Sequence, residues 1–391
     1  MRRLTVALFL LVSLLMAVPA AAGTPDDLEG RIEPFLGEPF MEKQRLFEEQ
    51  RFPNVVVTLD GTVLATWGSD EVKARRSGDG GDTWGPEIVI EEGTHGGGTL
   101  VDENTGDVLV FVHPEHPPRD TSAALRTMYR SKDGGKTWEA DEDVVFHEDA
   151  KGNVPSLHMS ETGITLRHGE HAGRLLRPAR VYNRPRGYNT AIYSDDGGET
   201  WHPSEPFPAR GTGEGAVAEL ADGRIYYNSR RHWAPEGTNP RRRWIAWSRD
   251  GGETWEDLLM EKVLPDGRQD RDYGCMGGLV RLPIRGRDIL LFSNLDTSRS
   301  RRERVTVWLS PDGGETWPVK RLVHDGSSKY SSLAAGRPGT KSEGQVYMLF
   351  EEGGGGCQVA RFNLSWVLGG TETGDGKLPD WIRGQAPGVN D

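Results

Sequence analysis

The sequence predicts an all-β fold, and more specifically a six-bladed β-propeller. A segment of the form Ser-x-Asp-Gly-Gly-x-Thr-Trp occurs five times, starting at residues 77, 131, 194, 248 and 310. The intervals between its copies are 54, 63, 54 and 62 residues, which leaves room for about four short strands and their turns. The 51 glycines and the lack of long helical periodicity also favour short strands and tight turns.

Each copy of this segment, which we call a box, has the residue types of a tight turn. Ser and Asp side chains accept backbone N–H groups, glycine adopts positive φ without steric cost, and tryptophan packs beside the turn. Strand-like runs such as "NTAIYS" and "RVTVWLS" come directly before the boxes. No box has the alternating acidic ligands and distal glutamate of a calcium loop. We therefore interpret the boxes as structural, with one box for each four-stranded sheet.

Two strand-like segments without a box predict a sixth sheet near the end of the chain. They read "GQVYMLFEEG" at 344–353 and "CQVARFNLSWVL" at 357–368. Sheets arranged radially in a closed ring protect their edges from unwanted pairing. We expect the propeller to span residues 45–370, between an N-terminal lead segment at 23–44 and a C-terminal tail at 371–391.

The first residues have the pattern of a signal peptide. Arg2 and Arg3 precede an apolar run from Leu4 to Val18, and small residues follow at 20–22. We expect residues 1–22 to be removed on export, which predicts a secreted or periplasmic protein. No later segment approaches the roughly 18 uninterrupted apolar residues of a membrane span, so none is expected.

Charge and cysteine content exclude two classes of protein. The net charge of -12 argues against a nucleic-acid partner, because such binding needs a dense basic surface. Cys275 and Cys357 are the chain's two cysteines, so disulfides cannot be the scaffold. Whether these two residues pair with each other cannot be read from the sequence.

Boxes of this form, in a chain with a leader and of this length, resemble those of the bacterial sialidases, or neuraminidases. The resemblance covers nearly the whole mature chain and implies a six-bladed propeller that holds the substrate carboxylate with three arginines. Arg51 opens "RFPNVVV", which is similar to the Arg-x-Pro motif of the family. Arg230 ends "GEGAVAELADGRIYYNSR", and Arg302 opens "RERVTVWLS", where the family has its second and third arginines.

The arginine match also has a physical reason. A guanidinium is planar, always charged and weakly hydrated, so it binds a carboxylate through two parallel hydrogen bonds even in a desolvated pocket. Neighbouring Arg231, Arg301 and Arg304 remain alternatives, because the motif registers could be shifted by a residue or two.

The resemblance also implies a tyrosine nucleophile. Tyr330 lies in "SSKYSSLA", which is similar to the Tyr-Ser-x-Leu segment of the family, and Glu214 in "GEGAVAEL" is at the position of its base. A neutral phenol suits a 2-keto acid sugar, whose own carboxylate would repel a carboxylate nucleophile. A free phenol titrates near pH 10 and therefore needs a base. Glu351 in "LFEEG" matches the acid that orients the first arginine.

One segment departs from the family. The family has a longer loop after the first arginine, with a further arginine and the aspartate that serves as general acid, where this chain has only "ATWGSDEVKARRS". Asp70 is the nearest candidate for the acid. His95, Glu115 and His116 are further groups that could donate a proton or bind substrate hydroxyls. The motifs "HPEH" and "HGEH" match no established zinc pattern, so neither a metal nor a cofactor is expected.

Taken together, these residues predict a retaining exo-glycosidase for terminal sialic acid or a related 2-keto acid sugar on glycoconjugates. Two alternatives remain open. The chain could hydrolyse another acidic glycan, or it could be a glycan-binding propeller without catalytic activity. The pair of Tyr330 and Glu214 argues against the second alternative, because a binding module does not need a nucleophile and its base.

Overall fold

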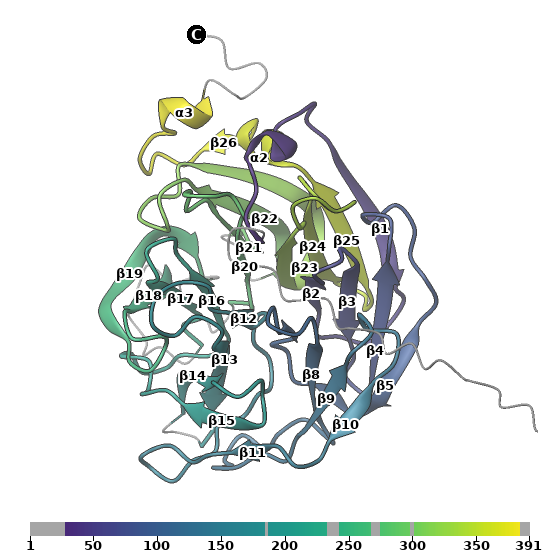
Figure 1. The fold of residues 1–391 in the computed structure, drawn as a ribbon. Coiled ribbons are helices and arrows are strands. Elements are labelled where there is room, and N and C mark those ends of the chain that lie inside the picture. The colour runs from purple at the N-terminus through teal and green to yellow at the C-terminus, as the bar shows by residue number, and fades with distance from the viewer. Residues whose placement is uncertain (1–27, 184–186, 233–241, 267–273, 298–300, 384–391) are drawn as a thin grey trace, which may run out of the picture.

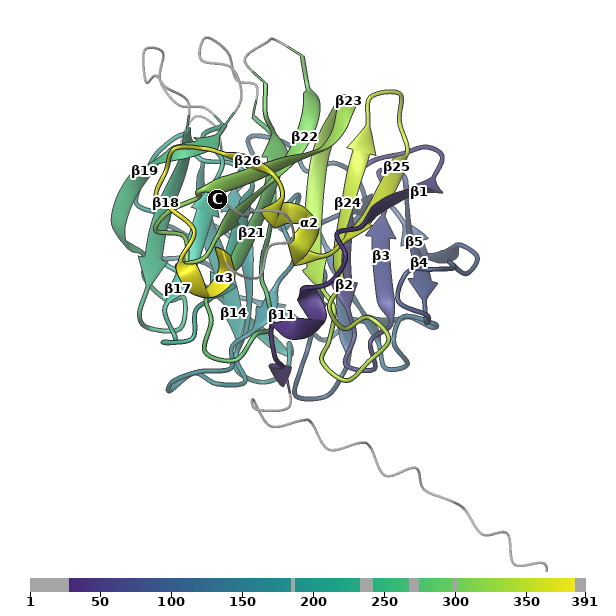
Figure 2. The same cartoon turned by 90° about the horizontal axis from the view of Figure 1, so that it is seen from above.

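The computed structural model describes residues 28–183, 187–232, 242–266, 274–297 and 301–383. The predicted leader at 1–22 lies outside these residues. The described chain is all-β, as predicted, with short helices at its two ends: η1 (Glu33–Phe35), α2 (Leu364–Leu368) and α3 (Asp380–Arg383). Figure 2 shows α2 and α3 on the outer side of the sheets, beside β26. No helix of the described part is long and apolar enough to cross a membrane.

The described strands pair into five sheets, almost entirely antiparallel. The first sheet consists of β2 (Asn54–Val57), β3 (Val63–Trp67), β4 (Glu71–Ser77) and β5 (Ile88–Glu92). The second consists of β6 (Thr94–His95), β7 (Leu100–Val101), β8 (Val108–His113), β9 (Thr127–Ser131) and β10 (Glu139–Asp141). The third consists of β11 (Val145–Phe146), β12 (Ile164–Thr165), β13 (Leu175–Val181), β14 (Tyr188–Ser194) and β15 (Thr200–Pro203). The fourth consists of β16 (Gly215–Glu219), β17 (Ile225–Ser229), β18 (Arg242–Ser248) and β19 (Glu256–Pro265).

The fifth sheet is twice as large because one long strand joins two groups. It contains β20 (Gly278–Arg281), β21 (Leu290–Leu295), β22 (Glu303–Ser310), β23 (Val319–Ala335), β24 (Val346–Glu352), β25 (Cys357–Phe362), β26 (Thr371–Glu372) and, from the N-terminus, β1 (Met41–Phe47). The first part of β23 pairs with β22, and its last part pairs with β24. β1 pairs with β25, so the start of the chain completes the last group of strands.

The sheets surround a common centre (Figure 1). Around this centre β2 contacts β23, β23 contacts β20, β20 contacts β16, β16 contacts β12, β12 contacts β7, and β7 contacts β2 again. The strands β5, β10, β15 and β19 lie at the periphery. Apolar side chains fill the space between neighbouring sheets. The cluster between the second and third sheets includes Phe111, Leu175 and Trp201.

The boxes form the turns that their sequence predicts. In the third box, the Ser194 hydroxyl donates to Asp196 at 2.7 Å and accepts the Gly198 N–H at 2.8 Å. The Asp196 carboxylate also accepts the N–H and the hydroxyl of Thr200. Trp201 is fully buried and donates its indole N–H to the Gly198 carbonyl. The other four boxes repeat the bond from the second glycine to the serine.

The structure corrects one predicted strand. Residues 364–368, predicted as part of a strand, form α2, because the Asn363 side chain accepts the Trp366 N–H and caps the helix. β1 begins at Met41, and β26 pairs with β23 after residue 370. Cys275 and Cys357 are separate buried thiols.

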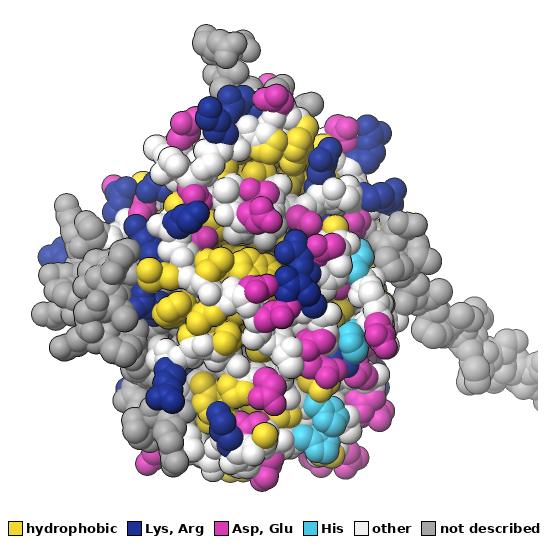
Figure 3. All heavy atoms as spheres, turned by 90° about the vertical axis from the view of Figure 1, so that its left-hand side faces the viewer, with side chains coloured by type: hydrophobic (Ala, Val, Ile, Leu, Met, Phe, Trp, Pro, Cys, Tyr) yellow, Lys and Arg dark blue, Asp and Glu magenta, His cyan; other side chains and the backbone are white. Residues whose placement is uncertain are grey.

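The outer face around β19 carries hydrophobic side chains among charged ones (Figure 3). β19 is the last strand of its sheet, and its Leu258, Leu259 and Met260 are each nearly 40% exposed. The candidate functional residues lie elsewhere, at one end of the ring.

Candidate active site

The predicted site residues lie at one end of the inner strands. Arg51 comes just before β2, Glu214 just before β16, and Tyr330 lies where β23 passes from β22 to β24. Arg230 follows β17 and Arg302 precedes β22. In an antiparallel sheet, the start of the first strand, the end of the second and the start of the third lie at the same end of the sheet. The boxes follow the third strands and therefore lie at the opposite end.

The centre of the site is a hydrogen bond between the predicted nucleophile and base. The Tyr330 hydroxyl donates to Glu214 Oε1 at 2.9 Å. Tyr330 and Glu214 are 8% and 2% exposed, so bulk water does not compete for this bond. Burial and the charge of Glu214 raise the pKa of Tyr330 above its ordinary value. The resting phenol is therefore neutral, and its proton points at a carboxylate.

Three cations keep Glu214 ionised. Burial favours the protonated form, but Arg230, His232 and Arg180 outweigh it and hold the pKa of Glu214 well below its ordinary value. Arg230 contacts Oε2 at 2.6 Å and Arg180 contacts Oε1 at 3.4 Å. Glu214 is therefore a carboxylate that can accept the Tyr330 proton.

Two arginines flank the ring of Tyr330. The guanidinium carbons of Arg51 and Arg302 lie 5.2 and 5.7 Å from its centroid. Arg302 is fixed by donating to the Gly274 carbonyl at 3.0 Å. Arg230 approaches from the side of Glu214. The structure thus brings all three predicted arginines around the Tyr330–Glu214 pair.

Arg51 is presented by a strained segment of backbone. Its neighbours Gln50 and Phe52 have φ values of 67° and 79°, a region that non-glycine residues rarely adopt. Glu351 holds the segment, because its Oε2 accepts from the Arg51 guanidinium at 3.1 Å and its Oε1 accepts the Phe52 N–H at 3.1 Å. Glu351 thus orients Arg51 through both the side chain and the backbone.

The candidate proton donors occupy different positions. Asp70 is exposed, and its N–H donates to the side chain of Gln50, the residue before Arg51. Its carboxylate bonds to Ser69 rather than to the Tyr330–Glu214 pair. His95 is fully buried, accepts the Gly97 N–H, and has a pKa that burial lowers to about 3. His95 therefore stays neutral and out of reach of a substrate.

His116 joins the site through a cluster of rings. Its imidazole lies 4.3 Å from that of His158, which packs edge-on against Phe52 at 5.1 Å. The Phe52 ring in turn lies 6.3 Å from that of Tyr330. Partial burial lowers the pKa of His116, and the charge of Arg180 lowers it further. Glu115, the residue before it, is exposed.

Sequence reasoning missed four residues at this site: Arg180, His232, His158 and Tyr182. Arg180 lies over the Tyr182 ring at 4.0 Å besides contacting Glu214. The repeat could have found it, since Arg180 lies one residue before the end of β13, the second strand of the third sheet, much as Arg230 follows β17, the second strand of the fourth. His158 lies in a loop whose course no local pattern in the sequence predicts.

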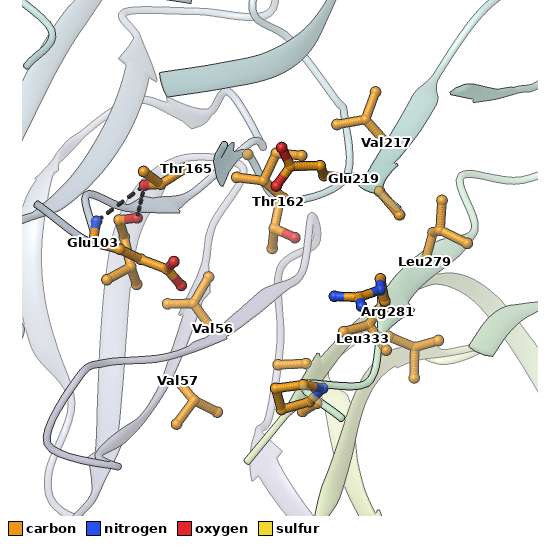
Figure 4. A pocket seen from close by; sticks show the side chains of 18 of the residues that line it. Val56, Val57, Glu103, Thr162, Thr165, Val217, Glu219, Leu279, Arg281 and Leu333 are labelled. Carbon is orange, nitrogen blue, oxygen red and sulfur yellow. Dashed lines mark hydrogen bonds between the residues drawn. The ribbon is translucent and has the colours of Figure 1, made fainter. Parts of the chain in front are cut away.

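A separate pocket opens at the other end of the inner strands. It has room of about 140 Å³ and apolar walls that include Val56, Val217 and Leu333 (Figure 4). Glu219 and Arg281 project into it. Glu219 accepts the N–H groups of residues 167 and 168, and burial raises its pKa to about 7. Its role on the strand is thus structural, and none of the predicted site residues lines this pocket.

Comparison with known proteins identifies the family. Residues 65–348 match the model of the BNR repeat-like domain. The chain belongs to this family. A curated sialidase of Micromonospora viridifaciens is 31% identical over 410 residues, covering 94% of this chain and 61% of the relative. These matches confirm the predicted membership of the bacterial sialidase family. The chain spans only about three fifths of that relative's length.

Solved sialidase structures share the fold of this BNR-family chain. The Hadza microbial sialidase Hz136 superposes with a TM-score of 0.62 at 25% identity, covering 82% of this chain and 66% of that one. A Trypanosoma rangeli sialidase, solved with 2,3-difluorosialic acid and described as a covalent intermediate, superposes with a TM-score of 0.59 at 19% identity. That match covers 86% of this chain and 58% of the other.

The position of Arg180 leads to a prediction for this BNR-family site. Replacing Arg180 by Gln removes one of the charges that hold Glu214 ionised, so the pKa of Glu214 should rise towards its ordinary value. Glu214 must be ionised to accept a proton, and the form that accepts it is lost as pH falls through that pKa. The acidic limb of kcat/KM against pH should therefore move to higher pH in R180Q.

Arg174→Gln is the matched control. Arg174 precedes the other end of the same strand, where it pairs with Asp195 and Glu253. R174Q should leave the acidic limb in place, and an unmoved limb in R180Q would show that Arg180 does not act on Glu214.

Proposed function

We propose that the chain is a retaining exo-glycosidase that hydrolyses terminal sialic acid, or a related 2-keto acid sugar, from glycoconjugates. The observation that carries the proposal is the buried hydrogen bond from Tyr330 to Glu214, with Arg51, Arg230 and Arg302 around it. We also propose that the groups of strands around the centre are six propeller blades, and that the enzyme acts after export.

The arginines would bind the carboxylate of the sugar. The guanidinium groups of Arg51 and Arg302 lie 5.2 and 5.7 Å from the centre of the Tyr330 ring, so a carboxylate bound by them would hold its neighbouring anomeric carbon close to the phenol. Arg230 donates to Glu214 Oε2 at 2.6 Å and would be the third arginine of the carboxylate site. Glu351 and Glu214 neutralise Arg51 and Arg230, and a neutral sugar would leave the remaining positive charge without an anion, which favours acidic substrates.

The phenol oxygen of Tyr330 attacks the anomeric carbon while its proton passes to Glu214. Because the pKa of Tyr330 is raised, the O–H bond breaks only as the new C–O bond forms. The bond to the aglycone oxygen breaks in the same step, and a general acid protonates that oxygen. Water then attacks the anomeric carbon from the opposite face and gives a proton to the deprotonated general acid. The sugar–tyrosine bond breaks in this step and Glu214 returns the proton to the phenol oxygen, so two inversions give net retention.

We propose His116 as the general acid. Both residues are exposed, but the His116 ring belongs to the cluster that reaches Phe52 and Tyr330, whereas the Asp70 carboxylate is bonded to Ser69. The acid form of His116 is present below its pKa, which lies below the ordinary value of 6.5. Hydrolysis should therefore be fastest in mild acid and decline as pH rises towards neutrality.

Replacing Tyr330 by Phe tests the function directly. The ring keeps its packing but loses the nucleophilic oxygen, so hydrolysis of a fluorogenic sialoside should fall by several orders of magnitude at unchanged melting temperature. Tyr347→Phe is the control. Tyr347, on β24, is also buried, but its hydroxyl donates to the carbonyl of Gly80 in the first box and not to a site residue. Parent activity in Y330F would refute the mechanism.

The same assay separates the alternatives if the parent enzyme is tested on a panel of acidic glycosides. Hydrolysis of another acidic glycan and of no sialoside would keep the site and change the substrate. Binding of sialosides without hydrolysis of any panel member would indicate a binding module.

Replacing His116 by Gln tests the general acid. Loss of the acid should lower kcat/KM about 10²- to 10⁴-fold for sialosides with a sugar aglycone. Aryl sialosides should be much less affected, because a phenolate leaves without a proton. Asp70→Asn is the paired variant and should stay near the parent rate. A selective loss in D70N instead would assign the acid to Asp70, and equal losses on both kinds of substrate in H116Q would give His116 a binding role.

A further inference from the structure

We infer that Glu161 is a positioning residue, which sets the geometry between Tyr330 and Glu214 from beneath the site. This role rests on the proposed function for its catalytic consequence. Glu161 lies between β11 and β12, touches neither the phenol nor the Glu214 carboxylate in any described contact, and is fully buried. Its effect therefore passes through the backbone segments that carry the two reacting groups.

One side of Glu161 holds the segment of the nucleophile. Its Oε1 accepts the Ser332 hydroxyl at 2.9 Å and the Leu333 N–H at 2.8 Å. These residues follow Tyr330 by two and three positions on the inner part of β23. The Ser332 hydroxyl oxygen also accepts the Val55 N–H of β2, the strand that Arg51 precedes.

The other side holds the segment of the base. The N–H of Glu161 donates to the Gly215 carbonyl at 3.0 Å, and Gly215 directly follows Glu214. Glu161 therefore bonds to the strand of the nucleophile and to the strand of the base. These strands do not pair with each other: β16 pairs with β17, while the inner part of β23 pairs with β24.

This bridge matters because the two reacting groups are 116 residues apart in sequence. Ladder hydrogen bonds fix each strand within its own sheet, but leave the offset between inner strands to packing. A shift of about 1 Å in a reacting group can cost about 10²-fold in rate. Glu161 supplies directional bonds across that gap.

The cost of burying Glu161 supports a specific role. Burial raises the pKa of Glu161 well above its ordinary value, so it is an uncharged acid and does not compete with Glu214 for the arginines. Its Oε2 has no hydrogen-bond partner among the described residues. Burying a polar atom without a partner costs free energy, so an apolar side chain at this position would destabilise the fold less.

Two substitutions test the inference in the full-length protein. Glu161→Gln keeps an oxygen that can accept both bonds, and kcat should stay within about threefold of the parent. Glu161→Ala removes the acceptor, and kcat should fall at least about tenfold with a smaller change in KM. Ser332→Ala, which removes only the hydroxyl, should give an intermediate loss and serves if E161A folds poorly. Ser204→Ala is the control, because that buried hydroxyl bonds to Thr190 and Ala191 of the third sheet and accepts the Trp255 indole N–H, and contacts none of the site residues in any described bond.

A second readout does not depend on any substrate. In protein labelled with fluorotyrosine, the fluorine NMR signal of Tyr330 is the one missing from Y330F. E161A, or S332A in its place, should lower the pKa of that phenol by weakening the contact with Glu214, whereas E161Q should not. An unchanged phenol pKa in E161A and S332A would overturn the inference. Absence of sialidase activity in the parent would overturn the proposed function instead.

Discussion

Closure of the ring of sheets is the constraint on which the site depends. β1 pairs with β25 and thereby joins the start of the chain to its last group of strands. Only then can Arg51 reach Glu351, which lies 300 residues later, or β2 pack against β23. Inner strands that all run the same way along the axis place their first residues at one end. The site is built there from residues that no local segment contains together.

The charged side chains at that end of the ring stabilise one another's ionised forms. Arg51, Arg230 and Arg302 would repel each other if they were alone, but Glu351 neutralises the first and Glu214 the second. Arg230, together with His232 and Arg180, keeps Glu214 ionised, and burial and the ionised Glu214 keep the Tyr330 phenol protonated. An acidic sugar would add the anion that the remaining positive charge favours. The proposed preference for an acidic sugar and the neutral state of the Tyr330 phenol would thus have a common electrostatic origin.

The sequence predicts the repeating parts of this protein better than its particular ones. The boxes, the arginines and the Tyr330–Glu214 pair lie in segments whose residue types are dictated by a turn or by the reaction. Arg180 and His158 act through tertiary contacts: the repeat points to Arg180 by its likeness to Arg230, whereas the contacts of His158 with Phe52 and His116 appear only in the folded chain. His95 looks like a site residue in sequence and is buried in the structure, because burial depends on the neighbouring sheets. The helix at 364–368 resembles a strand by composition, and a single capping side chain decides the outcome.

The central claim is that Tyr330 becomes covalently bonded to the sugar. The most direct measurement is the intact mass of the protein after incubation with 2,3-difluorosialic acid, followed by peptide mapping of any adduct. A Trypanosoma rangeli sialidase complex with this compound is described as a covalent intermediate. Our account predicts one added sugar per chain, located on Tyr330 and absent from the Phe variant. An adduct on a carboxylate, or turnover of sialosides with no adduct at Tyr330, would contradict it.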